Sequence, residues 1–141
     1  FNCVSAKMLV LPRRWGGGPK LVDALARIFE RVTPRYAFYP GAHARYQALT
    51  RDRANVQTFG RGPEGSLPWT LVRGLDENEP ATLQFRMEPF CSILSMVELD
   101  ESDPGAFLDR ATTFCNDTLW GTLNAVLFVH PSQLQGSAFA A

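Results

Sequence analysis

Apolar side chains are spaced along the chain in a way that predicts alternating strands and helices. Residues 8–11 form a short, uninterrupted apolar run before Pro12, which is typical of a strand buried on both faces. From Pro19 the apolar positions recur every three or four residues, which predicts an amphipathic helix. Pro34 disfavours helical geometry at Thr33, so the helix is expected to end there.

The middle of the chain predicts one weaker helix and then several strand-like segments. The helix runs from Pro40 to about Asp52. The segments that follow are separated by turns rich in Gly, Pro, Asp, Asn and Glu, and they predict an irregular, partly antiparallel portion of sheet. They cover residues 56–59, 69–75 and 81–87.

The last third predicts a strand, a helix and a final strand. Residues 92–99 form an apolar strand pattern, and Asp103 with Pro104 then supplies an N-cap and a first-turn proline for a helix ending near Asn116. Residues 123–129 predict one more buried strand. This order of elements implies βαβ crossovers, so we expect an α/β fold with a partly parallel sheet and helices on its faces.

The composition is ordinary for a packed globular protein. Of the 141 residues, 45% are hydrophobic and 20% are charged, which predicts one domain over residues 1–141. Lys and Arg together number 14, as do Asp and Glu, so no net basic field favours nucleic acid. No apolar run approaches the roughly 20 residues of a membrane-spanning helix. We expect neither a nucleic-acid nor a membrane partner.

The cysteines and the basic residues form no recognisable metal or phosphate motif. Three cysteines without paired short spacings favour a reducing, cytoplasmic compartment and no metal site. Arg13, Arg14 and Lys20 surround a glycine-rich turn that lacks the spacing of a P-loop, and we interpret it as a solvated turn. The chain has no initiator Met and ends in small residues, so we expect a piece of a larger enzyme.

Cys3 is the candidate nucleophile. A thiolate is the strongest ordinary side-chain nucleophile near neutral pH, provided that its environment lowers its pKa or supplies a base. A single cysteine is nevertheless more often a small buried hydrophobe, so its surroundings decide. Here Cys3 is followed by small residues, by Lys7 and by the apolar run before Pro12.

Three motifs, in order, resemble the aldehyde dehydrogenases over nearly the whole chain, from Cys3 to about Val129. The segment from Cys3 to the first strand resembles the nucleophile region of that family. The segment EPFCS, starting at Glu88 and leading into a strand, resembles the Glu-x-Phe-Gly-Pro motif. Asn116 and the segment WGTL, starting at Trp120, resemble the family's Asn and aromatic-Gly-Leu turn.

The resemblance implies an NAD(P)-dependent enzyme that oxidises an aldehyde to a carboxylic acid. It implies that Cys3 forms a thiohemiacetal and then a thioester, with NAD or NADP as hydride acceptor. Glu88 would hydrogen-bond a hydroxyl of the nicotinamide ribose, and Phe90 would pack near the nicotinamide. The complete protein would be a homo-oligomer. Cys91 and Ser92 depart from the family pattern, because they replace its Gly and Pro.

Parts of the catalytic machinery are not found in this sequence. It has no glycine-rich nucleotide-binding turn, no general-base segment and no oxyanion-hole Asn before the nucleophile, so we expect the fragment alone to be inactive and to bind no cofactor. One alternative is a non-catalytic α/β domain for assembly or binding, suggested by Cys91 and Ser92. Another is a cysteine hydrolase that pairs Cys3 with His43. His130 is interpreted as an ordinary exposed or hydrogen-bonded histidine.

Overall fold

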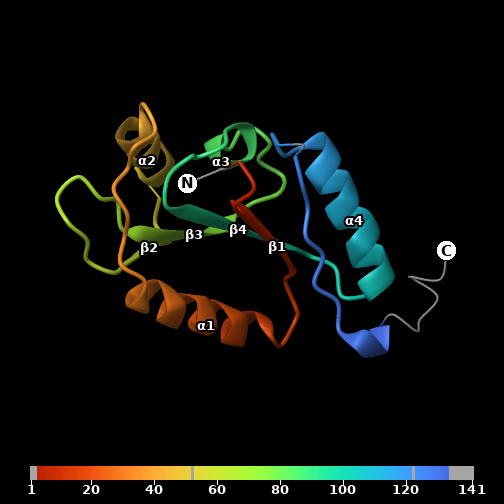
Figure 1. Cartoon of the computed structure of the whole chain (residues 1–141). Helices are drawn as coiled ribbons and strands as arrows, with labels where there is room; N and C mark the ends of the chain where they lie inside the picture. The colour runs from red at the N-terminus through yellow and green to blue at the C-terminus, as the bar shows by residue number, and fades with distance from the viewer. Residues whose placement is uncertain (1–2, 52, 122, 134–141) are drawn as a thin grey trace.

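Within the described residues, four strands form one mixed sheet with helices on both faces (Figure 1). The structure, a computed structural model, describes residues 3–51, 53–121 and 123–133. The strands are β1 (Met8–Pro12), β2 (Val56–Phe59), β3 (Trp69–Leu75) and β4 (Ile93–Leu99). Their order in the sheet is β1-β4-β3-β2. Because β1 and β3 run parallel to β4 and only β2 is antiparallel, the expected α/β class with a partly parallel sheet is confirmed.

The helices divide between the two faces of the sheet. They are α1 (Gly18–Arg31), α2 (Ala42–Thr50), α3 (Leu83–Arg86) and α4 (Pro104–Asp117), followed by the 3-10 helix η1 (Pro131–Gln133). In Figure 1, α1 lies below the sheet, α2 and α3 lie above it, and α4 stands to its right; α2, α3 and α4 share one core cluster. None of the described helices has the length and apolar character needed to cross a membrane.

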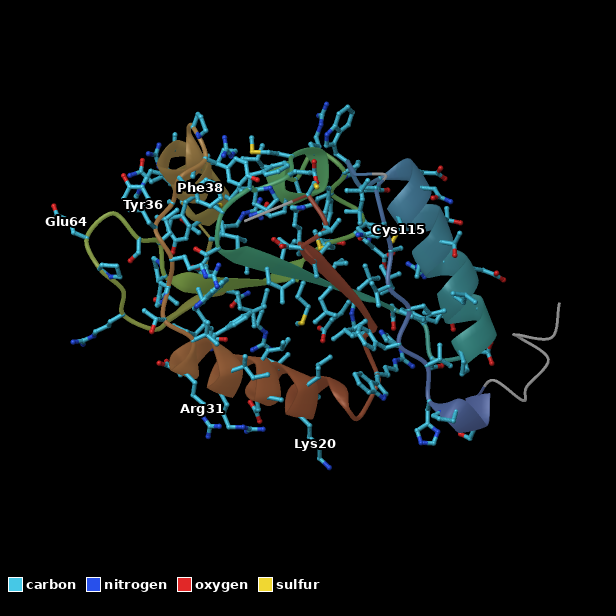
Figure 2. The ribbon with its side chains drawn as sticks, viewed as in Figure 1. Lys20, Arg31, Tyr36, Phe38, Glu64 and Cys115 are labelled. Atoms are coloured by element: carbon cyan, nitrogen blue, oxygen red, sulfur yellow. The ribbon has the colours of Figure 1, made fainter. Side chains whose placement is uncertain are left out.

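On the face of the sheet covered by α1, apolar side chains of the predicted helix pack against the strands. Leu21 and Val22 pack with Leu71 and Met96 of the sheet. Side chains on the opposite face of the helix, such as Lys20, point away from the sheet (Figure 2). The helix is therefore amphipathic, as the spacing predicts, and its burial against the sheet is the main source of its stability.

The larger core lies on the other face and joins three helices to the sheet. Val72 and Val97 of the sheet are fully buried there, as is Phe85 of α3. Phe85 and Phe114 of α4 meet edge to face with ring centroids 5.1 Å apart. Such a pair adds about 0.5 to 1.5 kcal/mol beyond the area it buries. The two phenylalanines thus fix α3 and α4 to one another as well as to the sheet.

Residues 81–87 were expected to form a strand, and that prediction is wrong. Four of these residues form α3 instead, starting from a turn in which the Phe85 N–H donates to the Thr82 carbonyl at 3.0 Å. The side chain of Gln84 donates to the Leu49 carbonyl at 2.7 Å and so anchors the turn to α2. Apolar residues at every second position suggested a strand, but a run this short does not separate a strand from a buried helical turn.

Residues 123–129 were also expected to form a buried strand, and here too the structure differs. They have no regular secondary structure, and Leu123, Val126 and Phe128 are 61%, 73% and 88% exposed. The preceding residue that still packs against the core is Leu119. The apolar pattern is present, but among the described residues no strand pairs with it. A strand pattern becomes a buried strand only where a neighbouring strand accepts it.

Replacement of Phe85 by Ala should lower the free energy of unfolding by about 3 to 5 kcal/mol, because it leaves a cavity between α3, α4 and the sheet. Phe38→Ala is the matched control, since that side chain is 63% exposed and should change stability by less than about 1 kcal/mol. Denaturant unfolding followed by circular dichroism measures both. Equal losses in the two variants would show that Phe85 is not a core residue.

Candidate active site

The amino ends of two neighbouring parallel strands carry the residues that the sequence singles out. Lys7 directly precedes β1, and the segment containing Glu88 and Phe90 ends just before β4. Since β1 and β4 are adjacent and parallel, with Met8 opposite Ser95, their preceding segments meet at the same edge of the sheet. The Ser95 N–H donates to the Lys7 carbonyl at 2.9 Å, which extends the pairing to Lys7 itself.

The ammonium group of Lys7 contacts both predicted motifs. Its Nζ lies 3.2 Å from Glu88 Oε1 and 5.1 Å from the centre of the Phe90 ring. The same Nζ donates a hydrogen bond to the Cys3 carbonyl at 3.3 Å. The side chains of Lys7 and Glu88 keep only 16% and 31% of their exposure, so solvent screens this pair less than an ordinary surface pair. Lys7 thus joins Cys3, Glu88 and Phe90 into one cluster.

Phe90 has an unusual backbone conformation. Its φ of 41° makes it the one non-glycine residue with positive φ among those described. A left-handed conformation in a bulky residue costs on the order of 1 to 3 kcal/mol, and such residues cluster at functional sites. The ring is held by Tyr39, whose centroid lies 5.2 Å away in an edge-on arrangement. This strained backbone places the Phe90 ring between Lys7 and Tyr39.

An open hollow of about 400 Å³ lies beside this cluster and is lined by Tyr39, Pro40, Arg45, Glu88 and Phe90. Arg45, on α2, closes one wall, because its Nε donates to the Pro89 carbonyl at 2.8 Å and its guanidinium also donates to the Pro40 carbonyl at 2.9 Å. The hollow therefore combines two aromatic rings with one carboxylate and one cation. That is the composition of a small-molecule site, in which apolar walls surround a few polar groups.

Sequence reasoning missed Arg45 and the role of Tyr39. In the sequence, Tyr36, Phe38 and Tyr39 form an aromatic cluster between two prolines, a pattern that allows either packing under the loop or contact with another domain or subunit. Only Tyr39 is partly covered, whereas Tyr36 and Phe38 are each 63% exposed and lie beside the loop that carries Glu64 (Figure 2). No local motif marks Arg45, since its partners are carbonyl groups of residues distant in sequence or in a preceding turn.

Cys3 lies in an exposed turn before β1. Its carbonyl is held by Lys7, so its main chain belongs to the cluster, and its thiol is open to solvent. A free cysteine exposed to solvent has the access that thiol chemistry requires. The other two described cysteines differ from it in this respect.

Cys91 and Ser92, the two departures from the family motif, are both buried. Ser92 Oγ is within hydrogen-bonding distance of the carbonyls of Pro68 and Leu67, at 2.7 and 3.2 Å. Burial raises the pKa of the Cys91 thiol to about 11. Burial also raises the pKa of Cys115, which lies on the side of α4 that faces the sheet (Figure 2). These residues therefore have packing roles.

The third motif and the histidines are not joined to the cluster. Asn116 is exposed on α4, and the Trp120 N–H donates to the Phe85 carbonyl while its side chain is 72% exposed. Thr122, within the same motif, lies outside the described residues. His43 is exposed on α2, and His130 contacts Ser132. Within the described part of the chain, no hydrogen bond or ion pair links these groups to the cluster around Lys7.

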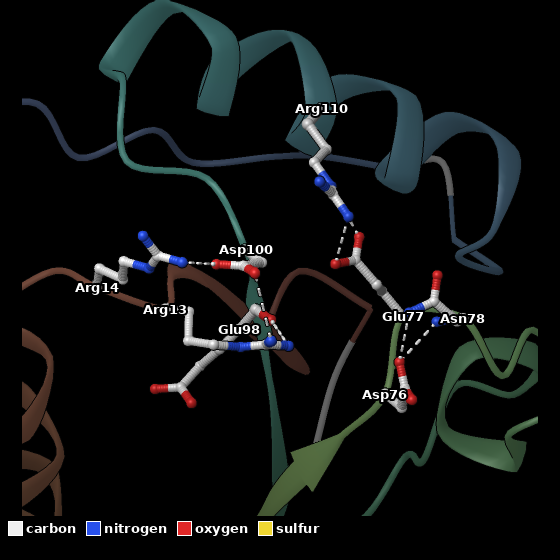
Figure 3. A network of polar contacts seen from close by, with 8 residues as sticks. All are labelled: Arg13, Arg14, Asp76, Glu77, Asn78, Glu98, Asp100 and Arg110. Atoms are coloured by element: carbon white, nitrogen blue, oxygen red, sulfur yellow. Dashed lines mark hydrogen bonds and ion pairs between the residues drawn. The ribbon is translucent and has the colours of Figure 1, made fainter.

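The opposite edge of the sheet is occupied by ion pairs (Figure 3). At the carboxyl ends of β1 and β4, Arg13 and Arg14 lie 3.9 and 3.4 Å from the carboxylate of Asp100. Arg110 of α4 holds Glu77 through two hydrogen bonds of 3.0 and 2.7 Å. Ligands of open α/β sheets usually bind at this carboxyl edge. In this chain the hollow lies at the amino edge instead. Arg13 and Arg14, of the glycine-rich basic turn, form ion pairs at the surface.

Metal chemistry finds no support in the described part of the chain, where no three His, Cys, Asp or Glu side chains gather as a set of ligands. The cluster around Lys7 offers one carboxylate and aromatic walls. Such a set suits an organic ligand with a planar ring and hydroxyl groups better than it suits a cation.

At pH 8, an alkylating reagent such as iodoacetamide should modify Cys3 well before Cys91 and Cys115. Cys3 is exposed, whereas at this pH a thiol of pKa about 11 is ionised to only about one part in a thousand. As the pH rises towards 11, the rate at Cys91 should increase about tenfold per pH unit. Peptide mapping by mass spectrometry measures each site, with the denatured chain as control. Equal rates for all three thiols in the folded chain would refute this assignment.

No protein-family model, no curated protein and no solved structure matches the chain. The resemblance to the aldehyde dehydrogenases therefore rests on the sequence motifs and stays a prediction.

Proposed function

We propose that this chain is part of the catalytic region of an NAD(P)-dependent aldehyde dehydrogenase. One observation carries the proposal: Lys7 contacts Glu88, Phe90 and the main chain of Cys3 at one edge of the sheet. The two motifs are far apart in sequence, and no pattern within either requires them to meet. Their contact supports a shared site for a nucleophile and a cofactor.

In this proposal Cys3 is the nucleophile. Its thiolate adds to the aldehyde carbonyl carbon and forms a thiohemiacetal. When bound, NAD(P)+ supplies the acceptor for the hydride that leaves that carbon, which converts the thiohemiacetal to a thioester. Water then hydrolyses the thioester, releasing the carboxylic acid and regenerating the thiol. Lys7 holds the turn that carries Cys3 through a hydrogen bond to the Cys3 carbonyl.

The hollow fits one part of the cofactor. The proposal assigns to this open hollow, of about 400 Å³, only the nicotinamide riboside portion of the cofactor. Lys7 contacts Glu88 Oε1, and a carboxylate with two oxygens keeps acceptor capacity for a ribose hydroxyl. Phe90 and Tyr39 supply flat apolar walls for a planar ring. The remaining half of the cofactor would need other parts of a longer protein.

The alternative functions receive less support. The replacements at Cys91 and Ser92 suggest a non-catalytic role. Both residues are buried, however, and Ser92 is hydrogen-bonded to a backbone carbonyl, so packing explains them. Glu88 and Phe90 of the same motif are retained. A hydrolase that pairs Cys3 with His43 would need the imidazole within hydrogen-bonding reach of the thiol. His43 is exposed on α2, and the contacts of the cluster come from Lys7 and Arg45 instead.

In the protein encoded by the complete reading frame, Cys3→Ser should lower kcat for aldehyde oxidation by at least about a thousandfold, because the hydroxyl is a far weaker nucleophile. Cys115→Ser, at a half-buried cysteine on α4, is the matched control and should leave kcat unchanged. Glu88→Gln should raise the KM for NAD(P)+ about tenfold while alkylation of Cys3 proceeds as before. NAD(P)H absorbance measures the reaction.

Retention of full aldehyde oxidation in Cys3→Ser would exclude Cys3 as the nucleophile. A wild-type protein that neither binds NAD(P)+ nor oxidises aldehydes would instead favour the non-catalytic domain. Calorimetric titration with NAD+ distinguishes this case from a catalytic protein whose aldehyde substrate has not been supplied.

A further inference from the structure

No strand of the described residues lies beyond the outer edge of β1, and the backbone geometry shows which groups this edge offers. The Ser95 N–H donates to the Lys7 carbonyl, and the Arg13 N–H donates to the Leu99 carbonyl. Odd-numbered residues of this strand therefore direct their backbone groups towards β4. Because successive residues alternate, the N–H and C=O groups of Met8 and Val10 point to the other side. Among the described residues no strand pairs with that side.

Pro12 fits the same geometry. As an even-numbered residue it faces the outer edge, where its lack of an N–H removes no bond to β4. The outer edge of β1 therefore offers a short row of four groups, two donors and two acceptors, on Met8 and Val10. An apolar strand with such an unpaired edge is a template for a further strand.

The direction of the crossovers identifies where the chain after α4 belongs. The connection from β3 through α3 to β4 crosses the face of the sheet that carries the larger core. It takes the chain from β3 to the neighbouring strand on the side nearer β1. α4 follows β4 and packs on the same face. Crossovers between parallel strands keep one hand, so two crossovers on the same face move in the same direction. The position next to β4 is taken by β1, and the next position in that direction is the outer edge of β1.

The segment after α4 has the length and composition of a strand that could pair with the outer edge of β1. Residues 123–129 are rich in apolar and β-branched side chains and are followed by His130 and Pro131. Val126 and Phe128 are 73% and 88% exposed, an unfavourable state for two such residues in one short segment. In Figure 1 this segment descends on the β1 side of the sheet, between β1 and α4 in the view.

We propose that residues 123–129 dock on the outer edge of β1 of the same chain as a fifth, parallel strand. Docking pairs the backbone groups of Met8 and Val10 and covers apolar side chains that are otherwise exposed. It converts the edge strand β1, which positions Lys7, into an interior strand of the sheet. The additional backbone hydrogen bonds thereby restrict the motion of β1 near the edge of the sheet at which the Lys7 cluster lies.

Amide hydrogen exchange of the full chain, measured by NMR, tests this pairing residue by residue. The amides of Leu9 and Leu11 face β4 with or without the fifth strand, so they are internal controls. The Val10 amide is bonded only when the fifth strand is docked. It should exchange within about tenfold of Leu9 and Leu11. Exchange of Val10 more than about tenfold faster than that of both controls would overturn the proposal.

A pair of proline variants identifies the segment that protects Val10. Adjacent residues of a strand point their N–H groups to opposite sides, so only one of Val126→Pro and Leu127→Pro removes an N–H directed at β1. In that variant, exchange of the Val10 amide should accelerate by more than about tenfold, and exchange of the Leu11 amide should stay unchanged. The other proline variant should accelerate Val10 exchange by a smaller factor. Unaltered Val10 exchange in both variants would refute docking of this segment.

The same strand could instead come from a second copy of the chain. Sedimentation at several concentrations separates the two cases, because strand exchange between copies makes the protection of Val10 depend on dimer formation. A monomer with a protected Val10 amide supports docking within one chain. Protection that appears only with the dimer would contradict it and assign the edge of β1 to an interface between copies.

Discussion

Parallel pairing of β1 with β4 is the constraint on which the rest of the structure depends. It aligns Met8 with Ser95 and brings the segment before each strand to the same edge of the sheet. The salt bridge of Lys7 with Glu88 is a consequence of this pairing, as is the contact of Lys7 with Phe90. Without the pairing, the turn that carries Cys3 and the Glu-Pro-Phe segment would be two unrelated loops. The candidate site is thus a product of strand register.

The helices contribute the walls of the site more than its chemistry. α2 supplies Arg45, which is bonded to the carbonyls on both sides of the hollow, and the turn before α2 supplies Tyr39. The phenylalanine pair between α3 and α4 secures the same face of the sheet farther along the chain. At the carboxyl edge, the ion pair of Arg110 with Glu77 ties α4 to the turn after β3. Local rigidity and candidate chemistry therefore occupy opposite edges.

Much of the fold was predictable from periodicity, whereas the site was predictable only in part. The strands at 56–59 and 69–75 and the helix beginning at Pro104 follow from local patterns, and the structure has them at those positions. Residues 81–87 were predicted wrongly, and residues 123–129 are not paired with any strand of the described sheet, because burial of Phe85 and strand pairing are decided by tertiary structure. Glu88 and Phe90 were identified through a motif, but Arg45 acts through backbone carbonyls and leaves no sequence signal.

The central claim is that Lys7 couples the two motifs energetically, and a double-mutant cycle with Lys7→Met and Glu88→Gln measures this directly. The free energies of unfolding of the wild type, both single variants and the double variant give the coupling free energy. For this half-buried pair we predict a favourable coupling of about 0.5 to 1 kcal/mol that persists in moderate salt. A coupling free energy indistinguishable from zero would contradict the account, because the two motifs would then not share a site in solution.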